Sequence, residues 1–287
     1  MEGEPESGKH HGFDGAEGCH RQPAQLGQGE TQEKSSIQEE CTMLNEYENE
    51  AFFQQYAEMS RSREGLSAAG EWHQLKPLFP PLEGKSVLDL GCGYGWHCIY
   101  AMEHGASSVV GVDISHKMLE VAKEKTHFPQ VEYKCCAIED VEFPEESFDV
   151  ILSSLAFHYV ADYEILVKKI YRILKSGGKL VFTVEHPVFT AYGTQDWYYN
   201  EKGEILHFPV DNYYYEGKRT AVFLGEKVTK FHRTLTTYLN TLLSNGFIIN
   251  HIVEPQPPEY MMDIPGMQDE MRRPMMLIVS ANKKVDR

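Results

Sequence analysis

One short segment, Val87-Leu88-Asp89-Leu90-Gly91-Cys92-Gly93-Tyr94-Gly95, joins an apolar run to three glycines in alternate positions. The run at residues 85–90 favours a buried β-strand that ends where the glycines begin. Because glycine carries no side chain, the backbone of such a loop can come close to a bound molecule. Ligands of open α/β sheets bind outside the carboxyl ends of the strands. Residues 89–95 are therefore where we first expect a binding site.

Strands and helices alternate on both sides of this segment. We expect seven strands, at residues 85–90, 108–113, 131–136, 148–153, 179–185, 247–254 and 275–281. Amphipathic or capped helical segments are expected at residues 96–104, 115–125, 162–175 and 232–245. This alternation predicts an α/β fold with a doubly wound, seven-stranded and mostly parallel sheet.

Three segments depart from the alternating pattern. Residues 1–42 carry nine acidic and three basic side chains with few large apolar ones, which predicts a disordered acidic tail. Residues 43–80 are expected to form an N-terminal helical arm that opens with an amphipathic helix at 46–60. The main domain would span residues 81–287. Within it, residues 187–231 are rich in aromatic side chains and turn signals, which predicts an antiparallel lid insertion over the sheet.

Composition excludes several classes of function. The net charge of −16 disfavours nucleic acid as a partner, since an acidic surface repels phosphate backbones. No apolar run reaches the roughly 20 residues of a membrane helix, and no secretory signal is visible. The six cysteines lack paired spacing, which fits a reducing, cytoplasmic location. Cys92 and Cys98 have a poor spacing for a metal, so no metal is expected.

Two acidic residues point to the kind of ligand. Asp113 ends the second strand, 22 residues beyond Gly91, where a carboxylate can accept hydrogen bonds from ribose hydroxyls. A dinucleotide site would need a third spaced glycine, but Trp96 stands at that position. Asp89 would also repel a pyrophosphate, whereas it suits a cofactor with positive charge. An NAD-linked dehydrogenase is therefore disfavoured.

Four motifs in order resemble those of the class I S-adenosylmethionine-dependent methyltransferases. They are residues 87–95, residues 110–115, residues 139–141 together with 147–151, and the turn at 174–180 before the fifth strand. The resemblance is close over residues 84–185 and looser over 232–281. It implies a Rossmann-like fold, with S-adenosylmethionine as the cofactor and S-adenosylhomocysteine as its product.

The resemblance also assigns cofactor contacts. The loop residues Gly91, Cys92, Gly93 and Gly95 would border the methionine moiety, with Asp89 near its amino group. Asp113 would hold the ribose hydroxyls, and Ile114 and Met118 would flank the adenine. Ile138 and Glu139 would lie at the edge of the adenine. Ser153 would present its carbonyl to the amino group.

Three histidines are candidates for a general base, which methyl transfer needs only when the acceptor is protonated. His186 ends the fifth strand, and Pro187 predicts an extended exit from it. His158 follows the fourth strand. His232 is expected to open the last helix, where it and Arg233 would bind a polar or anionic acceptor, or would equally cap the helix or pair with acidic residues. The other expected acceptor contacts are Phe53 and Tyr56 in the arm, Glu185, and Trp197 and Tyr213 in the insertion.

The interpretation that follows is a cytoplasmic methyltransferase acting on oxygen or nitrogen of a small molecule. A protein or peptide methyltransferase is one alternative, and a non-catalytic S-adenosylmethionine-binding module is another. The aromatic side chains of the insertion would form a cage for the acceptor. An aromatic core within the insertion, or a contact in a homodimer, would explain them equally well.

Overall fold

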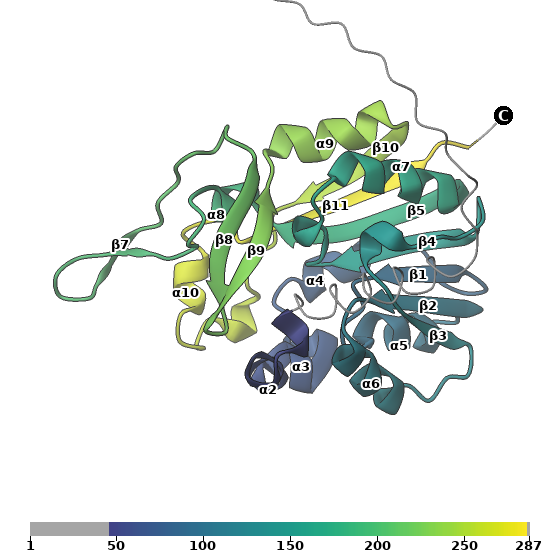
Figure 1. Cartoon of the computed structure of the whole chain (residues 1–287), viewed down its shortest axis with the longest axis horizontal. Coiled ribbons are helices and arrows are strands. Elements are labelled where there is room, and N and C mark those ends of the chain that lie inside the picture. The colour runs from purple at the N-terminus through teal and green to yellow at the C-terminus, as the bar shows by residue number, and fades with distance from the viewer. Residues whose placement is uncertain (1–45, 286–287) are drawn as a thin grey trace, which may run out of the picture. The chain divides into compact units, whose positions relative to one another are not determined.

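The computed structural model describes residues 46–285 and is built around a seven-stranded sheet (Figure 1). The strand order is β10-β11-β5-β4-β1-β2-β3. The strands are β1 (Ser86–Leu90), β2 (Ser108–Asp113), β3 (Val131–Cys135), β4 (Phe148–Ser154), β5 (Leu174–Glu185), β10 (Phe247–Val253) and β11 (Met276–Lys283). Strands β1 to β5 pair in parallel, whereas β11 pairs antiparallel with both β5 and β10. The predicted seven-stranded, mostly parallel sheet is confirmed.

Helices cover both faces of the sheet (Figure 1). Helices α7 (Tyr163–Ile173) and α9 (Leu235–Ser244) pack on one face, against inward-pointing residues such as Leu88 and Ile151. Helices α5 (Trp96–Glu103) and α6 (His116–Lys125) contribute to the core on the other face, against Val87 and Val150. Adjacent strand residues point to opposite faces, so a strand covered on both sides is apolar throughout. This explains the short continuous apolar runs in the sequence.

The arm consists of several short helices. They are η1 (Glu46–Glu48), α2 (Glu50–Glu58), α3 (Ser60–Glu64), η2 (Gly65–Ala68), α4 (Trp72–Leu75) and η3 (Lys76–Leu78). The single helix predicted at 46–60 is wrong in its bounds, because Asn49 caps α2 and the extended backbone of Met59 ends it. The predicted acidic tail at 1–42, and residues 43–45, lie outside the described residues.

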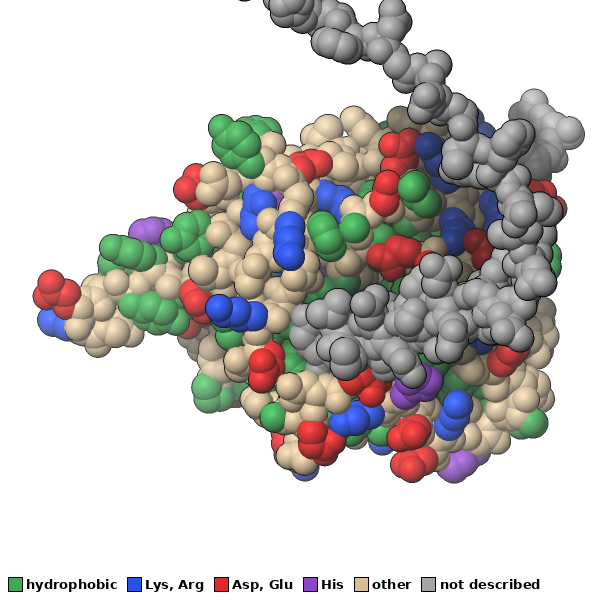
Figure 2. Space-filling model, viewed as in Figure 1, with side chains coloured by type: hydrophobic (Ala, Val, Ile, Leu, Met, Phe, Trp, Pro, Cys, Tyr) green, Lys and Arg blue, Asp and Glu red, His purple; other side chains and the backbone are tan. Residues whose placement is uncertain are grey.

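The insertion after β5 begins with a helix and continues as two antiparallel hairpins. Its elements are α8 (Pro187–Ala191), β6 (Tyr198–Tyr199), β7 (Ile205–His207), β8 (Gly217–Phe223) and β9 (Glu226–His232). The predicted extended exit at Pro187 is wrong, because proline is favoured at the first position of a helix and His186 supplies the cap. The β6–β7 hairpin projects from the sheet (Figure 1), and hydrophobic side chains lie on the surface of this projection (Figure 2). Tyr198, Tyr199 and Leu206 of the hairpin are exposed.

His232 belongs to a strand and not to a helix. It pairs with Gly217 at the end of β9, and helix α9 begins at Leu235 after the cap Thr234, whose hydroxyl accepts from the Thr237 amide. The sequence prediction for residues 232–245 was therefore wrong at its start. Between β10 and β11 lie two further short helices, η6 (Glu259–Met261) and α10 (Met267–Glu270).

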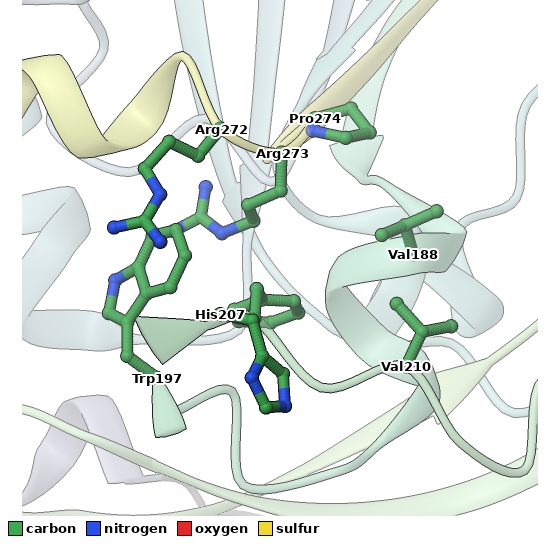
Figure 3. A pocket seen from close by; sticks show the side chains of 8 residues that line it. Val188, Trp197, His207, Val210, Arg272, Arg273 and Pro274 are labelled. Atoms are coloured by element: carbon green, nitrogen blue, oxygen red, sulfur yellow. The ribbon is translucent and has the colours of Figure 1, made fainter. Parts of the chain in front are cut away.

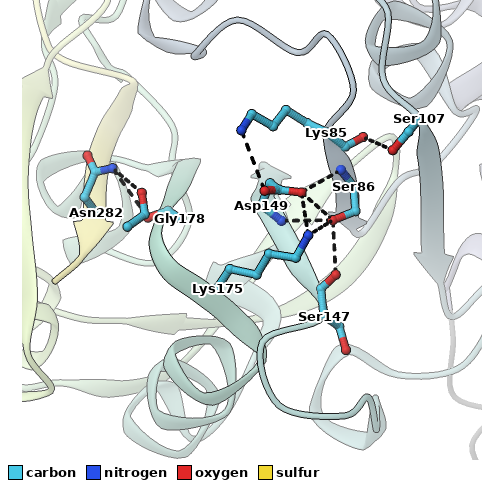
Figure 4. A network of polar contacts seen from close by, with 9 residues as sticks. Lys85, Ser86, Ser107, Ser147, Asp149, Lys175, Gly178 and Asn282 are labelled. Carbon is cyan, nitrogen blue, oxygen red and sulfur yellow. Dashed lines mark hydrogen bonds and ion pairs between the residues drawn. The ribbon is translucent and has the colours of Figure 1, made fainter. Parts of the chain in front are cut away.

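A polar network joins the strands at the amino end of β1, away from the glycine loop (Figure 4). Asp149 at the start of β4 lies 2.7 Å from Lys175 Nζ and accepts hydrogen bonds from the amide and hydroxyl of Ser86. Burial alone would raise the pKa of Asp149, but Lys175 and Ser86 lower it to about 2. These contacts fix the start of β5 against β1 and β4. Within residues 46–285, none of the helices combines the length and apolarity that crossing a membrane requires.

Candidate functional site

The three glycines after β1 all have positive φ angles, but their surroundings differ. A Cβ on Gly91 would lie 2.4 Å from Ala156 Cβ, and one on Gly95 would lie 2.2 Å from the Tyr133 hydroxyl. A Cβ on Gly93 would meet only the Tyr56 hydroxyl, at 3.8 Å. Gly91 and Gly95 are therefore required by packing within the protein. Gly93 is the glycine whose backbone remains open to a ligand.

Asp113 at the end of β2 holds this loop in place. Its Oδ2 accepts a hydrogen bond of 2.8 Å from the Gly93 amide, and its Oδ1 accepts one of 2.9 Å from the Ser115 amide. Burial raises the pKa of the Asp113 carboxyl, against the lowering effect of these amides. Each oxygen of a carboxylate can accept more than one hydrogen bond, so capacity for ribose hydroxyls remains.

Asp89 is a fully buried carboxylate that lacks a charge partner. Its Oδ2 accepts a 3.5 Å hydrogen bond from the Cys98 thiol, while Oδ1 has no hydrogen-bond partner within the described part of the chain. Burial raises the pKa of Asp89 to about 7. An unpaired buried charge is costly, so a group that brings a cation or a donor to Oδ1 would be bound favourably. The donor set thus fits the ammonium group of a cofactor.

The turns after β3 and β4 complete this side of the site. Ala156 packs against Gly91, and Ile138 in η4 (Ile138–Asp140) would lie 3.5 Å from a Cβ there. Leu155 has a φ of +55°, and its amide donates to both oxygens of Thr183. Such strain in a non-glycine residue is common where a ligand is positioned. The Ser153 hydroxyl donates to Leu90 O at 2.7 Å.

The remaining predicted cofactor contacts lie around the same loop. Met118 is buried near the start of α6, where its amide donates to the Ser115 hydroxyl. The carbonyl of Ile114 accepts a contact from the Cys135 thiol. The carbonyl of Glu139 accepts from Lys169.

The arm lies over the glycine loop. Phe53 and Tyr56 both pack against Tyr94, with ring centroids 6.1 and 5.6 Å apart from it. Glu48 accepts a 2.6 Å hydrogen bond from the His116 amide, and Glu50 forms an ion pair with Lys117. These contacts attach the arm to the first turn of α6, next to Asp113.

Arg61 is a basic residue of the arm that sequence patterns did not single out. Its Nη2 lies 2.7 Å from Glu71 Oε1, and Glu71 is buried with Oε2 lacking a partner among residues 46–285. Burial, together with the charge of Arg61, lowers the pKa of nearby His97 to about 4. Arg61 also interacts electrostatically with Tyr56, whose hydroxyl would lie 3.8 Å from a Cβ on Gly93. A cation is therefore held near the loop by an ion pair within the arm.

A buried charged cluster lies at the end of β5. Glu185 accepts hydrogen bonds from Lys230 Nζ at 2.5 Å and from Gln195 Nε2 at 2.6 Å, and Lys230 also donates to Gln195. Lys230 lies over the rings of Tyr159 and Phe223. Burial alone would raise the pKa of Glu185, but His158, Lys230 and Gln195 together lower it. Glu185 was predicted from the sequence, whereas Lys230 and Gln195 were not.

His158 adjoins this cluster in a fixed tautomer. Its Nδ1 accepts a 3.3 Å hydrogen bond from the Glu185 amide, so the neutral ring carries its proton on Nε2. Burial lowers the pKa of His158 to about 4. The ring is therefore neutral at physiological pH, with Nε2–H as its donor.

The other two histidines both have polar neighbours, but Nε2 of His186 has no hydrogen-bond partner among the described residues. His186 accepts from the Val188 amide at Nδ1, and its Nε2 lies 2.9 Å from Glu254 Oε1, although the alignment falls short of a hydrogen bond. His232 lies 2.7 Å from the Thr190 hydroxyl and 2.9 Å from Tyr213 O. Burial lowers the pKa of both rings. The predicted role of either as a base stays a prediction.

The predicted acceptor residues fall into separate groups. Arg233 is buried, donates to the carbonyls of Val160 and Ala161, and so joins β9 to the segment before α7. The Tyr213 hydroxyl accepts from the Leu235 amide. Trp197 lies elsewhere, under the guanidinium groups of Arg272 and Arg273. The sequence did not predict that Trp197 lies apart from Tyr213 and Arg233. The reason is that α8 and the two hairpins of the insertion run in different directions (Figure 1).

The described residues contain no group of three histidine, cysteine or acidic side chains that could hold a metal ion.

Comparison with known proteins gives one family model and several similar structures. Residues 88–182 match the family model described as a methyltransferase domain. A crystal structure classed as an S-adenosylmethionine-dependent methyltransferase from Listeria monocytogenes is 57% identical, covering 77% of this chain and 99% of that one, with a TM-score of 0.74. One from Mesorhizobium loti is 39% identical, covering 76% and 100% of the two chains, with a TM-score of 0.71.

A curated relative matches only part of the sequence. The ubiquinone biosynthesis O-methyltransferase of Coxiella burnetii is 36% identical over 113 residues, which make up 39% of this chain. The match spans about half of that relative, 48% of its length.

Proposed function

Because this chain belongs to the class I S-adenosylmethionine-dependent methyltransferases, we propose that it transfers a methyl group to oxygen or nitrogen of a small-molecule acceptor. The observation that carries the proposal is the contact between the arm and the β8–β9 hairpin. Phe52 of α2 is fully buried against Ala221 and Val228 of that hairpin. The hydroxyls of Tyr47 and Tyr159 also lie 3.3 Å apart. Two segments joined in this way would cover a small acceptor, whereas a protein substrate needs an open trough.

The cofactor is S-adenosylmethionine, and several residues are suited to hold it. We propose that Asp89 Oδ1 receives its ammonium group and that Asp113 receives its ribose hydroxyls. The backbone at Gly93 would border the methionine moiety. Ile114 and Met118 would flank the adenine, with Ile138 and Glu139 at its edge.

Arg61 is suited to the methionine carboxylate. It is the cation that the arm holds near the loop, and its partner Glu71 leaves part of the guanidinium free to donate. Asp89 would then bind the ammonium group and Arg61 the carboxylate of the methionine moiety. Sequence spacing did not suggest Arg61, because its position depends on how the arm folds back on α5.

The bound cofactor supplies a methyl group activated by a positively charged sulfur. The residues of this chain would then align the acceptor and exclude water, and such positioning can supply a large part of the rate acceleration. We propose that His158 donates from Nε2 to a polar atom of the acceptor and orients it. The Glu185–Lys230 ion pair would hold the end of β5 against β9, next to His158. A neutral histidine of low pKa is a weak base, which favours an acceptor that already presents a lone pair.

The test is a turnover assay with the full chain. Purified protein is incubated with S-adenosylmethionine and a panel of phenols, amines and carboxylates, and mass spectrometry detects methylated products and S-adenosylhomocysteine. We expect a product from at least one small molecule and loss of that product in Asp113→Ala. A peptide library run in parallel addresses the alternative, and methylation confined to peptides would refute a small-molecule acceptor. The cytoplasmic location stays a prediction from the cysteine pattern.

A further inference from the structure

A cavity of about 290 Å³ lies in the lid insertion, between α8, the β7 region and the residues that precede β11. We call it the Arg273 pocket (Figure 3). Its lining residues are Val188, Trp197, His207, Phe208, Val210, Arg272, Arg273 and Pro274. None of them belongs to the glycine loop, to β2 or to the turn after β4, so this cavity is separate from the cofactor residues described above.

Arg273 is the buried polar group of this pocket. Its side chain is 6% exposed, and its two terminal nitrogens bind Glu270 at 2.7 and 3.0 Å. The guanidinium lies over Phe189 and Phe208, with 4.5 and 5.0 Å to the ring centroids. Its Nε atom is buried, yet has no hydrogen-bond partner among the residues that the structure describes. A buried donor without an acceptor is unfavourable, and a ligand oxygen would relieve it.

The walls of the pocket define the rest of the ligand. Trp197 and Phe208 are perpendicular to each other, 5.3 Å apart, and Arg272 lies over the Trp197 ring. Val188, Val210 and Pro274 complete an apolar surface (Figure 3). Aromatic and guanidinium planes favour a flat ring by stacking and edge contacts.

The charged side chains that line the pocket are basic, and Nε of Arg273, unpartnered among the described residues, is the group that favours an anionic acceptor. No acidic side chain lines the cavity, whereas two arginines and a histidine do. Asp269 and Glu270 belong to α10, and each pairs with one of the two arginines without lining the cavity. Small-molecule sites are typically apolar cavities with a few convergent polar groups, and this cavity fits that description.

We infer that the Arg273 pocket binds a small aromatic carboxylate, with a carboxylate oxygen accepting from Arg273 Nε and the ring packed against Trp197 and Phe208. The inference rests on the lid alone and not on the proposed acceptor chemistry.

The probe for the test is benzoate, titrated into the full-length protein and followed by calorimetry. Benzyl alcohol lacks the anion and cyclohexanecarboxylate lacks the flat ring. We expect saturable benzoate binding, and affinities at least tenfold weaker for both analogues. S-adenosylmethionine is titrated into the same samples, so failure of the pocket and failure of the cofactor site are separate results.

Two variants locate the binding. Val210→Trp fills the cavity from a side chain that is 51% exposed, so the fold should tolerate it. Val222→Trp is the matched control, because Val222 is 60% exposed on β8 and does not line the pocket. We expect Val210→Trp to abolish benzoate binding and Val222→Trp to preserve it.

A third variant tests the contact with Nε. Arg273→Lys keeps the charge but removes Nε, and should weaken benzoate binding at least tenfold. No saturable binding, or binding that Val210→Trp leaves intact, would overturn the inference.

Discussion

Replacing Asp89 by asparagine should make the cofactor-free protein more stable while it damages cofactor binding. Asp89 is fully buried, Oδ1 lacks a partner among the described atoms, and burial raises its pKa from 3.8 to about 7. A shift of about three pKa units corresponds to about 4 kcal/mol of lost stability when the carboxylate is ionised. Asparagine carries no charge, so most of this cost should disappear.

The sign of the effect depends on pH. A carboxyl whose pKa is raised on folding binds more protons in the folded state, so stability falls as pH rises from about 4 to about 7. Asp89→Asn should therefore gain about 2–4 kcal/mol at pH 8, or roughly 5–10 °C in melting temperature. The gain should shrink to about 1 kcal/mol or less near pH 4.5.

Although Asp89→Asn should gain stability at pH 8, its affinity for S-adenosylmethionine should fall. A cationic ammonium group stabilises the ionised form of Asp89, so wild-type affinity should rise with pH up to a little above 7. Asp89→Asn should bind at least about tenfold more weakly at pH 8, since the charge-assisted contact is lost. Its affinity should also lose the dependence on pH around 7.

The assay is urea denaturation at pH 8 and pH 4.5, combined with calorimetric titration of S-adenosylmethionine. Asp149→Asn is the matched control, because its pKa is lowered to about 2 by Lys175 and Ser86 after burial is overcome. That substitution should reduce stability at pH 8 and leave the cofactor affinity unchanged. A loss of stability in Asp89→Asn at pH 8 would refute the reasoning, because it would mean that the carboxylate already has a stabilising partner.

Three further substitutions address other parts of the site. Asp113→Ala should weaken S-adenosylmethionine binding by about 1–3 kcal/mol in calorimetry, since the ribose contacts and the bond to the Gly93 amide are lost; an unchanged affinity would contradict its assignment. Lys230→Met should cost about 3–5 kcal/mol in urea denaturation by leaving Glu185 buried and unpaired, and addition of Glu185→Gln should recover much of it. His186→Ala should reduce turnover and spare cofactor binding if this ring is the base, and an unaltered pH–rate profile would remove it from that role.

The sheet could be predicted from the sequence because its determinants are local. Apolar runs such as Val87–Leu90 sit between turn signals, and caps such as Ser115 and Asp162 lie beside the helices they begin. The glycine loop was predictable for the same reason, since Asp89 and the glycines are neighbours in the chain. Asp113 needed only the expectation that parallel strands end at one edge of the sheet.

The antiparallel insertion was predicted, but the ion pairs and the way the insertion packs could not be, because the partners are distant in the sequence. Lys230 meets Glu185 across 45 residues, and this pairing depends on where the β8–β9 hairpin settles. Arg61 is oriented by Glu71, which no periodic pattern connects to it. His186 was expected before an extended segment because proline was taken as a marker of extended structure, although it also begins helices.

Phe52 joins two segments that would otherwise move independently. Because it is packed between α2 and the β8–β9 hairpin, displacing either segment exposes the same apolar cluster. Release of S-adenosylhomocysteine and binding of the next acceptor would then both require the same separation of α2 from the β8–β9 hairpin. In such a catalyst the slow event in each cycle is expected to be departure of the product and not bond making. A pre-steady-state burst, followed by a slower linear phase that speeds up when Phe52 is shortened, is the kinetic signature of that coupling.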